Sequence, residues 1–332
     1  MSQDVFHPAW WLPGPHAQTL GARLLRSRRG ITFRRERVEL EDGDFVDLDW
    51  TIVGGWASAP SAPLVLILHG LEGSARSKYA CELYRRLAAR GIEAVALNFR
   101  SCSGAMNRAA RLYHSGDTGD LRFVVEMLAR RFPDRPLGAA GFSLGGNVLL
   151  KFLSEPTASG TAGPIRAAAA VSVPFNLSAG ADALERGFSR LYRRYLVGKL
   201  QGKVAAKRAE LAPHIGVRQA LAARTFREFD DAATAPLHGF TDAEDYYRRS
   251  SSGPLLRQIV TPTLLVRAVD DPFLPATALP IRAARENPAI TGIFSARGGH
   301  VGFVAGQPWS PVFWAEQHVA AFLAQHLEGA PA

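Results

Sequence analysis

The sequence predicts an α/β fold in which a mostly parallel central sheet carries helices on both faces. Several short runs are apolar throughout rather than alternating, which indicates strands buried on both faces. Helix-like segments separate these runs, as the crossovers of a parallel sheet require. The 332 residues are 47% hydrophobic and show no clear linker between two cores. We therefore expect residues 1–332 to form a single domain.

The elements are expected in alternation along the chain. Residues 31–53 predict an antiparallel hairpin, because two alternating runs flank Asp42-Gly43, a strong turn pair. The strand-like runs that follow are 64–68, 94–98, 137–140, 167–173, 262–266 and 289–295. The helix-like segments are 74–90, 117–132, 145–155, 277–286 and 310–328.

The stretch 174–255 is too long for an ordinary crossover, and we expect a helical cap inserted into the domain. Apolar residues recur there at helical spacing, beside a basic face. The apolar positions are Leu184, Phe188, Leu191, Tyr192, Tyr195 and Leu196, and the basic ones are Arg186, Arg190, Arg193, Arg194 and Lys199. One interpretation is an amphipathic helix packed on the core, and the other is that some of the aromatic residues line an acyl pocket.

The N-terminal segment, residues 1–30, is expected to pack on the core. Phe6, Trp10 and Trp11 form an aromatic cluster of the kind found at membrane interfaces, but packing against the domain is the commoner reason for such a cluster.

The motif Gly141-Phe142-Ser143-Leu144-Gly145 lies between a strand-like run and a helix-like segment. A G-x-S-x-G in this context forms a sharp turn, because the glycines remove Cβ atoms that would clash and the serine hydroxyl is presented at the top of a sheet. The short pattern also occurs by chance, so its context has to support it. Ser143 is the predicted nucleophile.

Partners for a serine nucleophile follow in the order serine, aspartate, histidine. Asp271 is the predicted acid, with the adjacent Asp270 as the alternative, because both follow the strand-like run 262–266. Asn176 leaves no acid at the other position that such a site uses. His300 lies in a glycine-rich loop after the run 289–295 and is the predicted base.

The apolar run 64–68 leads into a glycine-containing turn, which predicts an oxyanion hole. One donor is expected to be the backbone amide of Leu71. The other is the amide of Leu144, at a helix N-terminus where the dipole also favours negative charge. Each such donor is worth about 10²–10³ in rate.

Six motifs carry a resemblance to a known family: Pro15–Leu20 (PHAQTL), His69–Ser74 (HGLEGS), Asn98–Gly104 (NFRSCSG), Tyr113–Gly116 (YHSG), Gly141–Asn147 (GFSLGGN) and Asp270–Phe273 (DDPF). With them the chain resembles the YheT-type branch of the α/β-hydrolase superfamily, related to eukaryotic α/β-hydrolase-domain lipases and esterases. The family's serine, acid and histidine then fall on Ser143, one of the two aspartates, and His300. Ser101 stands where the family usually has glycine.

The resemblance implies a serine hydrolase that cleaves carboxylic esters of small molecules or lipids through an acyl-enzyme. An acyltransferase or thioesterase on the same triad is the nearer alternative, because the acyl-enzyme does not dictate which nucleophile resolves it. A binding protein that keeps the fold without turnover is the more distant one.

The formal net charge of +9 permits binding to anionic partners. Nucleic acid is disfavoured, because the arginines are scattered and no nucleic-acid module accompanies them. The basic face of the cap predicts either peripheral contact with an anionic membrane or a solvated helix face.

No cofactor is expected, and the dispersed histidines match no metal-ligand motif. His114 is interpreted as a hydrogen-bonded structural histidine and Cys102 as a packed thiol. With two cysteines in the chain and no signal-like start, the predicted location is the cytoplasm.

Overall fold

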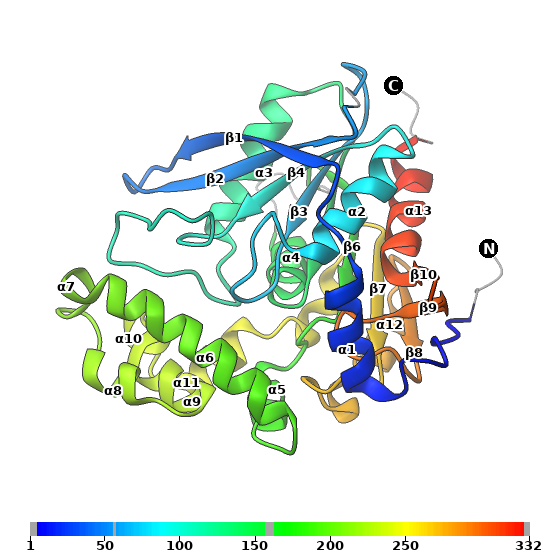
Figure 1. Ribbon diagram of the computed structural model, residues 1–332. Helices are drawn as coiled ribbons and strands as arrows, with labels where there is room; N and C mark the ends of the chain where they lie inside the picture. Colours follow the sequence, from blue (N-terminus) through cyan, green and yellow to red (C-terminus); the bar gives the residue numbers. More distant parts are fainter. Residues whose placement is uncertain (1–4, 56–57, 157–162, 329–332) are drawn as a thin grey trace.

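The computed structural model describes residues 5–55, 58–156 and 163–328, and within them an eight-stranded sheet is covered by helices (Figure 1). The strands are β1 (Ile31–Glu39), β2 (Phe45–Val53), β3 (Leu64–Leu68), β4 (Glu93–Asn98), β5 (Leu137–Phe142), β6 (Ile165–Val171), β7 (Thr263–Ala268) and β8 (Ile290–Ser295). Their order is β1-β2-β4-β3-β5-β6-β7-β8, with β1, β2 and β4 antiparallel to their neighbours and all later pairs parallel. The predicted fold class is therefore confirmed.

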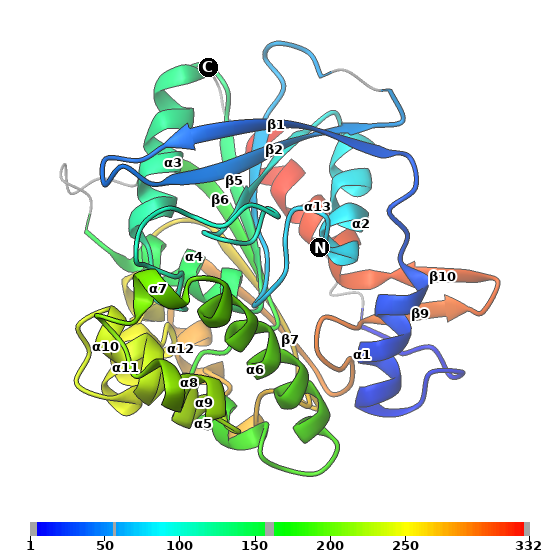
Figure 2. The ribbon, with the colours of Figure 1, turned by 60° about the vertical axis from the view of Figure 1, so that its left-hand side comes forward.

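Helices cover both faces of this sheet. On one face lie α2 (Lys78–Ala88) and α13 (Trp314–Glu328), and on the other α3 (Gly119–Arg131), α4 (Leu144–Ser154) and α12 (Ile281–Glu286) (Figures 1 and 2). All five residues of β3 are buried, as expected for a strand between two helical layers. Alanine and glycine dominate β5 and β6, so the helices approach these strands closely. A Cβ at Gly138 would lie only 2.9 Å from the Leu327 side chain of α13.

The segment between β6 and β7 is helical and lies at one end of the molecule (Figure 1). Its helices are α5 (Leu177–Ala183), α6 (Ser189–Ala206), α7 (Arg208–Leu211), α8 (Val217–Ala222), α9 (Phe226–Phe229), α10 (Ala235–Leu237) and α11 (Ala243–Ser250), with a π-helical turn at Asp230–Thr234 and a 3-10 helix at Gly253–Gln258. Val204, Leu211 and Phe229 contribute to a separate apolar cluster within it. We call this helical segment, residues 174–255, the lid segment.

The apolar stripe expected in this segment is divided between two elements. Leu184 is buried after α5, whereas α6 begins only at Ser189, after Gly187 with φ +49°. Leu191 and Tyr195 consequently face solvent, with 56% and 49% of their surface exposed. The interpretation of this stripe as one helix face packed on the core is wrong for these positions.

Two expected helices are shorter than predicted. Residues 310–313 form strand β10 (Ser310–Phe313), which pairs with β9 (Val304–Gln307), and α13 begins only at Trp314. Pro311 disfavours an earlier helix start, because it restricts the residue before it to extended conformations. The segment 277–286 is helical only from Ile281, after Pro280. The N-terminal segment forms helix α1 (Gly14–Leu25), and Phe6 contacts Phe303 and Trp314, while residues 1–4 of the expected segment 1–30 lie outside the described residues.

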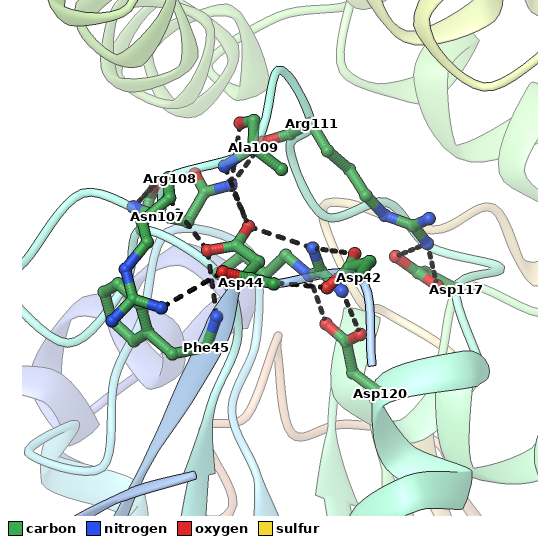
Figure 3. A network of polar contacts seen from close by, with 12 residues as sticks. Asp42, Asp44, Phe45, Asn107, Arg108, Ala109, Arg111, Asp117 and Asp120 are labelled. Atoms are coloured by element: carbon green, nitrogen blue, oxygen red, sulfur yellow. Dashed lines mark hydrogen bonds and ion pairs between the residues drawn. The ribbon is translucent and has the colours of Figure 1, made fainter. Parts of the chain in front are cut away.

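A long irregular loop, residues 99–118, follows β4 and is fixed by a buried polar network (Figure 3). Arg100 donates to both carboxylate oxygens of Asp120 at 2.8 and 2.7 Å, and to Asp44 at 2.9 Å. Asp44 also accepts from the side chain of Asn107 at 2.7 Å and from the backbone of Arg108 at 2.8 Å. Burial alone would raise the pKa of Asp44, but these hydrogen bonds outweigh it and hold the pKa below its usual value.

The same loop contains the position at which the family usually has glycine. Ser101 adopts φ +62°, a left-handed conformation that explains the preference for glycine there. Its hydroxyl donates to Asn107 Oδ1 at 2.5 Å. This hydrogen bond, together with the Asp44 network, holds the serine in place.

Replacing Asp44 by asparagine removes the central negative acceptor of this network and leaves buried donors without a charged partner. We expect the free energy of unfolding to fall by about 3 kcal/mol in urea titrations. Asp42→Asn is the matched control, because Asp42 contacts the same arginine at 2.7 Å but is 42% exposed. It should cost less than about 1 kcal/mol. Equal losses in the two variants would contradict a central role for the buried carboxylate.

Candidate active site

The turn between β5 and α4 holds Ser143 in a strained conformation. Its backbone angles are φ +51° and ψ −118°, a region that residues other than glycine rarely occupy. Two glycines make room for the turn: a Cβ at Gly141 would lie 2.5 Å from the carbonyl oxygen of Gly145, and one at Gly145 would lie 2.5 Å from that of His69. The Ser143 N–H donates to the carbonyl of Val171 at 2.8 Å, which ties the turn to β6.

The structure brings Ser143, His300 and Asp271 into contact. His300 Nε2 lies 3.0 Å from Ser143 Oγ, and His300 Nδ1 lies 2.9 Å from one carboxylate oxygen of Asp271 and 3.2 Å from the other. The Asp271 side chain is fully buried. Phe273 stacks on the imidazole with 4.0 Å between ring centroids and 2° between planes, and its N–H donates to Asp271. Stacking and carboxylate together fix the ring toward the serine.

The neighbouring acid has a different contact. Asp270 Oδ1 accepts a hydrogen bond from the Gly299 N–H at 2.9 Å and does not meet the imidazole. Burial raises the pKa of Asp270. The structure thus places Asp271 against His300, and Asp270 against the loop that carries it.

Helix α1 holds this histidine loop from outside. Thr19 Oγ1 accepts from the backbone N–H of His300 at 2.9 Å. The Gln18 amide is buried and exchanges two hydrogen bonds with Val304, accepting at 2.8 Å and donating at 3.1 Å. The N-terminal motif PHAQTL therefore supports the loop at both of its ends.

A buried arginine after α1 supports the middle of the same loop. Arg26 donates to the carbonyl oxygens of Val301 and Gly302 at 2.9 Å each, and pairs with the buried Glu316 of α13 at 2.7 Å. Val301 and Phe303 both have φ near +50°. A loop with two such strained residues persists only where its surroundings fix it, and α1 supplies that restraint.

The turn after β3 lies against Ser143. A Cβ at Gly70 would lie 3.3 Å from the Ser143 Cβ, and the Gly70 N–H donates to the Tyr79 hydroxyl at 2.8 Å. Leu71 and Leu144 both line the cavity above the serine, and Leu144 is the first residue of α4. The two predicted donors are thus on opposite sides of Ser143, in the region where an oxyanion hole is required.

A lysine of α6 reaches this turn. Glu72 has φ +54°, its N–H donates to the Tyr113 hydroxyl, and that hydroxyl donates back to its carboxylate, both at 2.8 Å. Lys203 Nζ donates to Glu72 at 2.7 Å and to Cys102 Sγ at 3.0 Å. Burial raises the pKa of the Cys102 thiol to about 11, so this cysteine is a packed thiol rather than a nucleophile.

Three further histidines near the site are buried. His69 Nε2 accepts from the Phe99 N–H at 3.2 Å, which joins the ends of β3 and β4. His114 Nδ1 accepts from the Gly116 N–H at 3.1 Å, and its ring lies 4.4 Å from that of His238. Burial lowers the pKa of His69 and His238 to about 4 and that of His114 to about 3. These side chains are neutral and structural at neutral pH.

A cavity of about 760 Å³ lies over Ser143 and His300, between the sheet and the lid segment. Its apolar lining includes Leu177, Leu184, Leu196 and Leu200, and it extends to the buried Asp230 and Tyr246. Across the described residues, no group of three or more histidine, cysteine, aspartate or glutamate side chains is arranged to hold a metal ion.

Sequence reasoning missed several residues that touch the site. Gln18 and Thr19 belong to a recognised motif, and Phe273 to another, so the motifs contained a signal without indicating a role. Lys203 had no signal, because nothing in the chain shows that α6 reaches the turn after β3.

A family model described as "alpha/beta hydrolase fold" matches residues 63–306. "Putative esterase YheT" of Escherichia coli (strain K12) is 41% identical over 98% of this chain and 95% of its own length. "Phospholipase ABHD3" of Mus musculus is 32% identical over 91% of this chain and 74% of its own length. "Monoacylglycerol lipase" of Saccharomyces cerevisiae is 31% identical over 76% of this chain and 58% of its own length.

Among solved structures, the Pyrococcus furiosus esterase Pf2001 superposes with a TM-score of 0.58, at 18% identity, covering 90% of this chain and 92% of that one. This likeness supports the fold alone. The sequence matches show that the chain belongs to the α/β-hydrolase family. Within that family it belongs with YheT, and the predictions of family and of hydrolase class are confirmed at this level.

Where the structure describes the chain, no helix is both long enough and apolar enough to cross a bilayer.

The buried histidines predict a loss of stability in mild acid. Their pKa values in the folded protein lie below the value of about 6.5 expected in the unfolded chain. The unfolded state therefore binds more protons between about pH 6.5 and 4, and the free energy of unfolding falls as pH is lowered through this range. Urea titrations between about pH 7 and 5 should show an uptake on unfolding that approaches three protons.

His238→Gln should reduce this uptake by about one proton. His7→Gln is the control, because His7 is exposed in the N-terminal segment and should leave the slope unchanged. An unchanged slope in His238→Gln would refute the assignment.

Proposed function

We propose that this protein is a serine hydrolase that cleaves carboxylic esters, including lipid esters, through Ser143, His300 and Asp271. The observation that carries the proposal is the continuous contact from hydroxyl to imidazole to buried carboxylate, at 3.0 and 2.9 Å. The relatives named esterase, phospholipase and lipase support the same class of substrate.

In the proposed reaction, His300 Nε2 accepts the proton of Ser143 Oγ as that oxygen attacks the ester carbonyl. Asp271 fixes the imidazole with its proton on Nδ1, leaving Nε2 free to accept. The leaving alcohol takes the proton from His300, and an acyl-enzyme on Ser143 results. Water, deprotonated by the same imidazole, then releases the acid and restores the serine.

The tetrahedral intermediates carry a negative oxygen, which the amides of Leu71 and Leu144 stabilise in this proposal. Their positions on either side of Ser143 support the assignment. The Lys203–Glu72 contact then holds the Leu71 turn in place from the lid segment. Fixed donors of this kind act without reorganisation during the reaction.

The lid segment and the cavity support an ester with a sizeable apolar part. A volume of about 760 Å³ with leucines near the serine accommodates an acyl chain. Acyl transfer and thioester cleavage use the same triad, and a product assay with added alcohol acceptors separates transfer from hydrolysis.

Substitutions of the three side chains test this mechanism. Ser143→Ala should lower kcat for p-nitrophenyl esters by about 10⁶ and abolish labelling by a fluorophosphonate probe. Asp271→Asn should lower kcat by about 10⁴, because the imidazole loses the partner that fixes its tautomer. Asp270→Asn, the matched control, should cost about tenfold, since Asp270 contacts only the Gly299 amide. Labelling that persists without the Ser143 hydroxyl would exclude the proposed nucleophile.

Thr19→Val tests the support of the histidine loop by α1. Valine keeps the shape but leaves the His300 N–H without its acceptor, so kcat should fall roughly tenfold while KM stays within about twofold. Thr19→Ser restores the hydroxyl and should restore kcat. Urea titrations identify any global loss of stability. A fall in kcat that Thr19→Ser shares would argue against a role for the hydrogen bond.

A further inference from the structure

Apolar side chains that face solvent surround the opening of the cavity. On α1, Leu20 and Leu24 are 38% and 76% exposed, and on α6, Leu191 and Tyr195 are 56% and 49% exposed. Leu20, Leu24 and Tyr195 also line the cavity. Because the same side chains meet both the cavity and the solvent, the cavity opens between α1 and α6, which lie at the same end of the molecule in both views (Figures 1 and 2).

The two helices form one continuous surface across this opening. The Arg23 guanidinium of α1 lies over the Tyr195 ring of α6, 5.6 Å from its centroid. His16 Nδ1 lies 3.1 Å from the Tyr192 hydroxyl, and the His16 ring is 4.7 Å from that of Phe188. The exposed side chains of the two helices thus surround a single entrance.

The charges on this surface have one sign. Neither α1 nor α6 contains an aspartate or glutamate. On α6, Leu191 and Tyr195 are four positions apart, and the exposed Arg190 and Arg194 form the neighbouring row. Arg23 adds an exposed positive charge on α1. We call these exposed residues of the two helices, together with Leu20 and Leu24, the entrance surface.

We propose that the entrance surface docks on an anionic lipid bilayer, so that lipid esters enter the cavity directly from the membrane. The proposal rests on the proposed function and names the source of its substrate. Exposed leucines and a tyrosine suit the boundary between headgroups and acyl chains, and flanking arginines attract lipid phosphates. A surface that is both apolar and uniformly basic complements a negatively charged layer over an apolar one.

Vesicle flotation of the full-length Ser143→Ala protein tests the docking without lipid turnover. The protein should float with vesicles of phosphatidylcholine and phosphatidylglycerol and far less with phosphatidylcholine alone, and high salt should weaken binding. Arg190→Gln/Arg194→Gln should reduce partitioning roughly 10- to 30-fold, about fivefold for each charge. Leu191→Ser should reduce it about tenfold.

Matched controls lie at the opposite edge of the sheet. Arg130→Gln/Arg166→Gln removes the same charge from the end of α3 and the start of β6, and Val260→Ser removes a residue that is 66% exposed before β7. These variants should bind as the parent does. Equal losses in the controls, or no binding to anionic vesicles, would overturn the proposal.

Two further results have defined meanings. A concentration-dependent dimer in solution that Leu191→Ser disrupts would make the entrance surface an interface between copies, against the proposal. Fluorophosphonate labelling of the wild-type chain tests the proposed function separately, because flotation requires no turnover. Flotation without labelling would retain the docking surface and reject the hydrolase mechanism.

Discussion

The close approach of three backbone segments at Ser143 is the constraint on which the site depends. The end of β5, the first turn of α4 and the turn after β3 meet where glycines at 141 and 145 leave no room for a side chain. This contact forces Ser143 into its left-handed conformation and aligns the Leu144 amide with the start of the helix. A methyl group at either glycine would have to move backbone rather than a flexible side chain, so the geometry of the nucleophile and of the helical layer cannot be separated.

The histidine side of the site is built differently. Its loop has two residues in strained conformations and contributes little regular structure of its own. Order comes from outside, through Gln18, Thr19 and Arg26, and from Phe273 stacked on the imidazole. The serine is thus positioned by the core of the sheet, and the base by side chains from a peripheral helix.

These two modes explain how much the sequence could predict. The buried strands and the serine turn follow from local patterns: continuous apolar runs, a G-x-S-x-G and the order of the acidic and histidine loops. The choice between Asp270 and Asp271 needed coordinates, because adjacent residues on a loop point in different directions. The support by Gln18 and Thr19 depends on contacts with residues more than 280 positions away, to which local periodicity is blind. The exposure of Leu191 and Tyr195 was missed because helical spacing identifies a face but not what covers it.

The support from α1 also bears on how the molecule is made. The first helix to be synthesised has its main hydrogen-bonding partners in the loop around His300 and in Glu316, among the last parts of the chain to leave the ribosome. Contacts of such high sequence separation form late, because closing a long chain segment is costly in entropy. Nascent chains therefore acquire a folded sheet before they acquire an aligned imidazole, and chemical competence arrives only with the completed polypeptide.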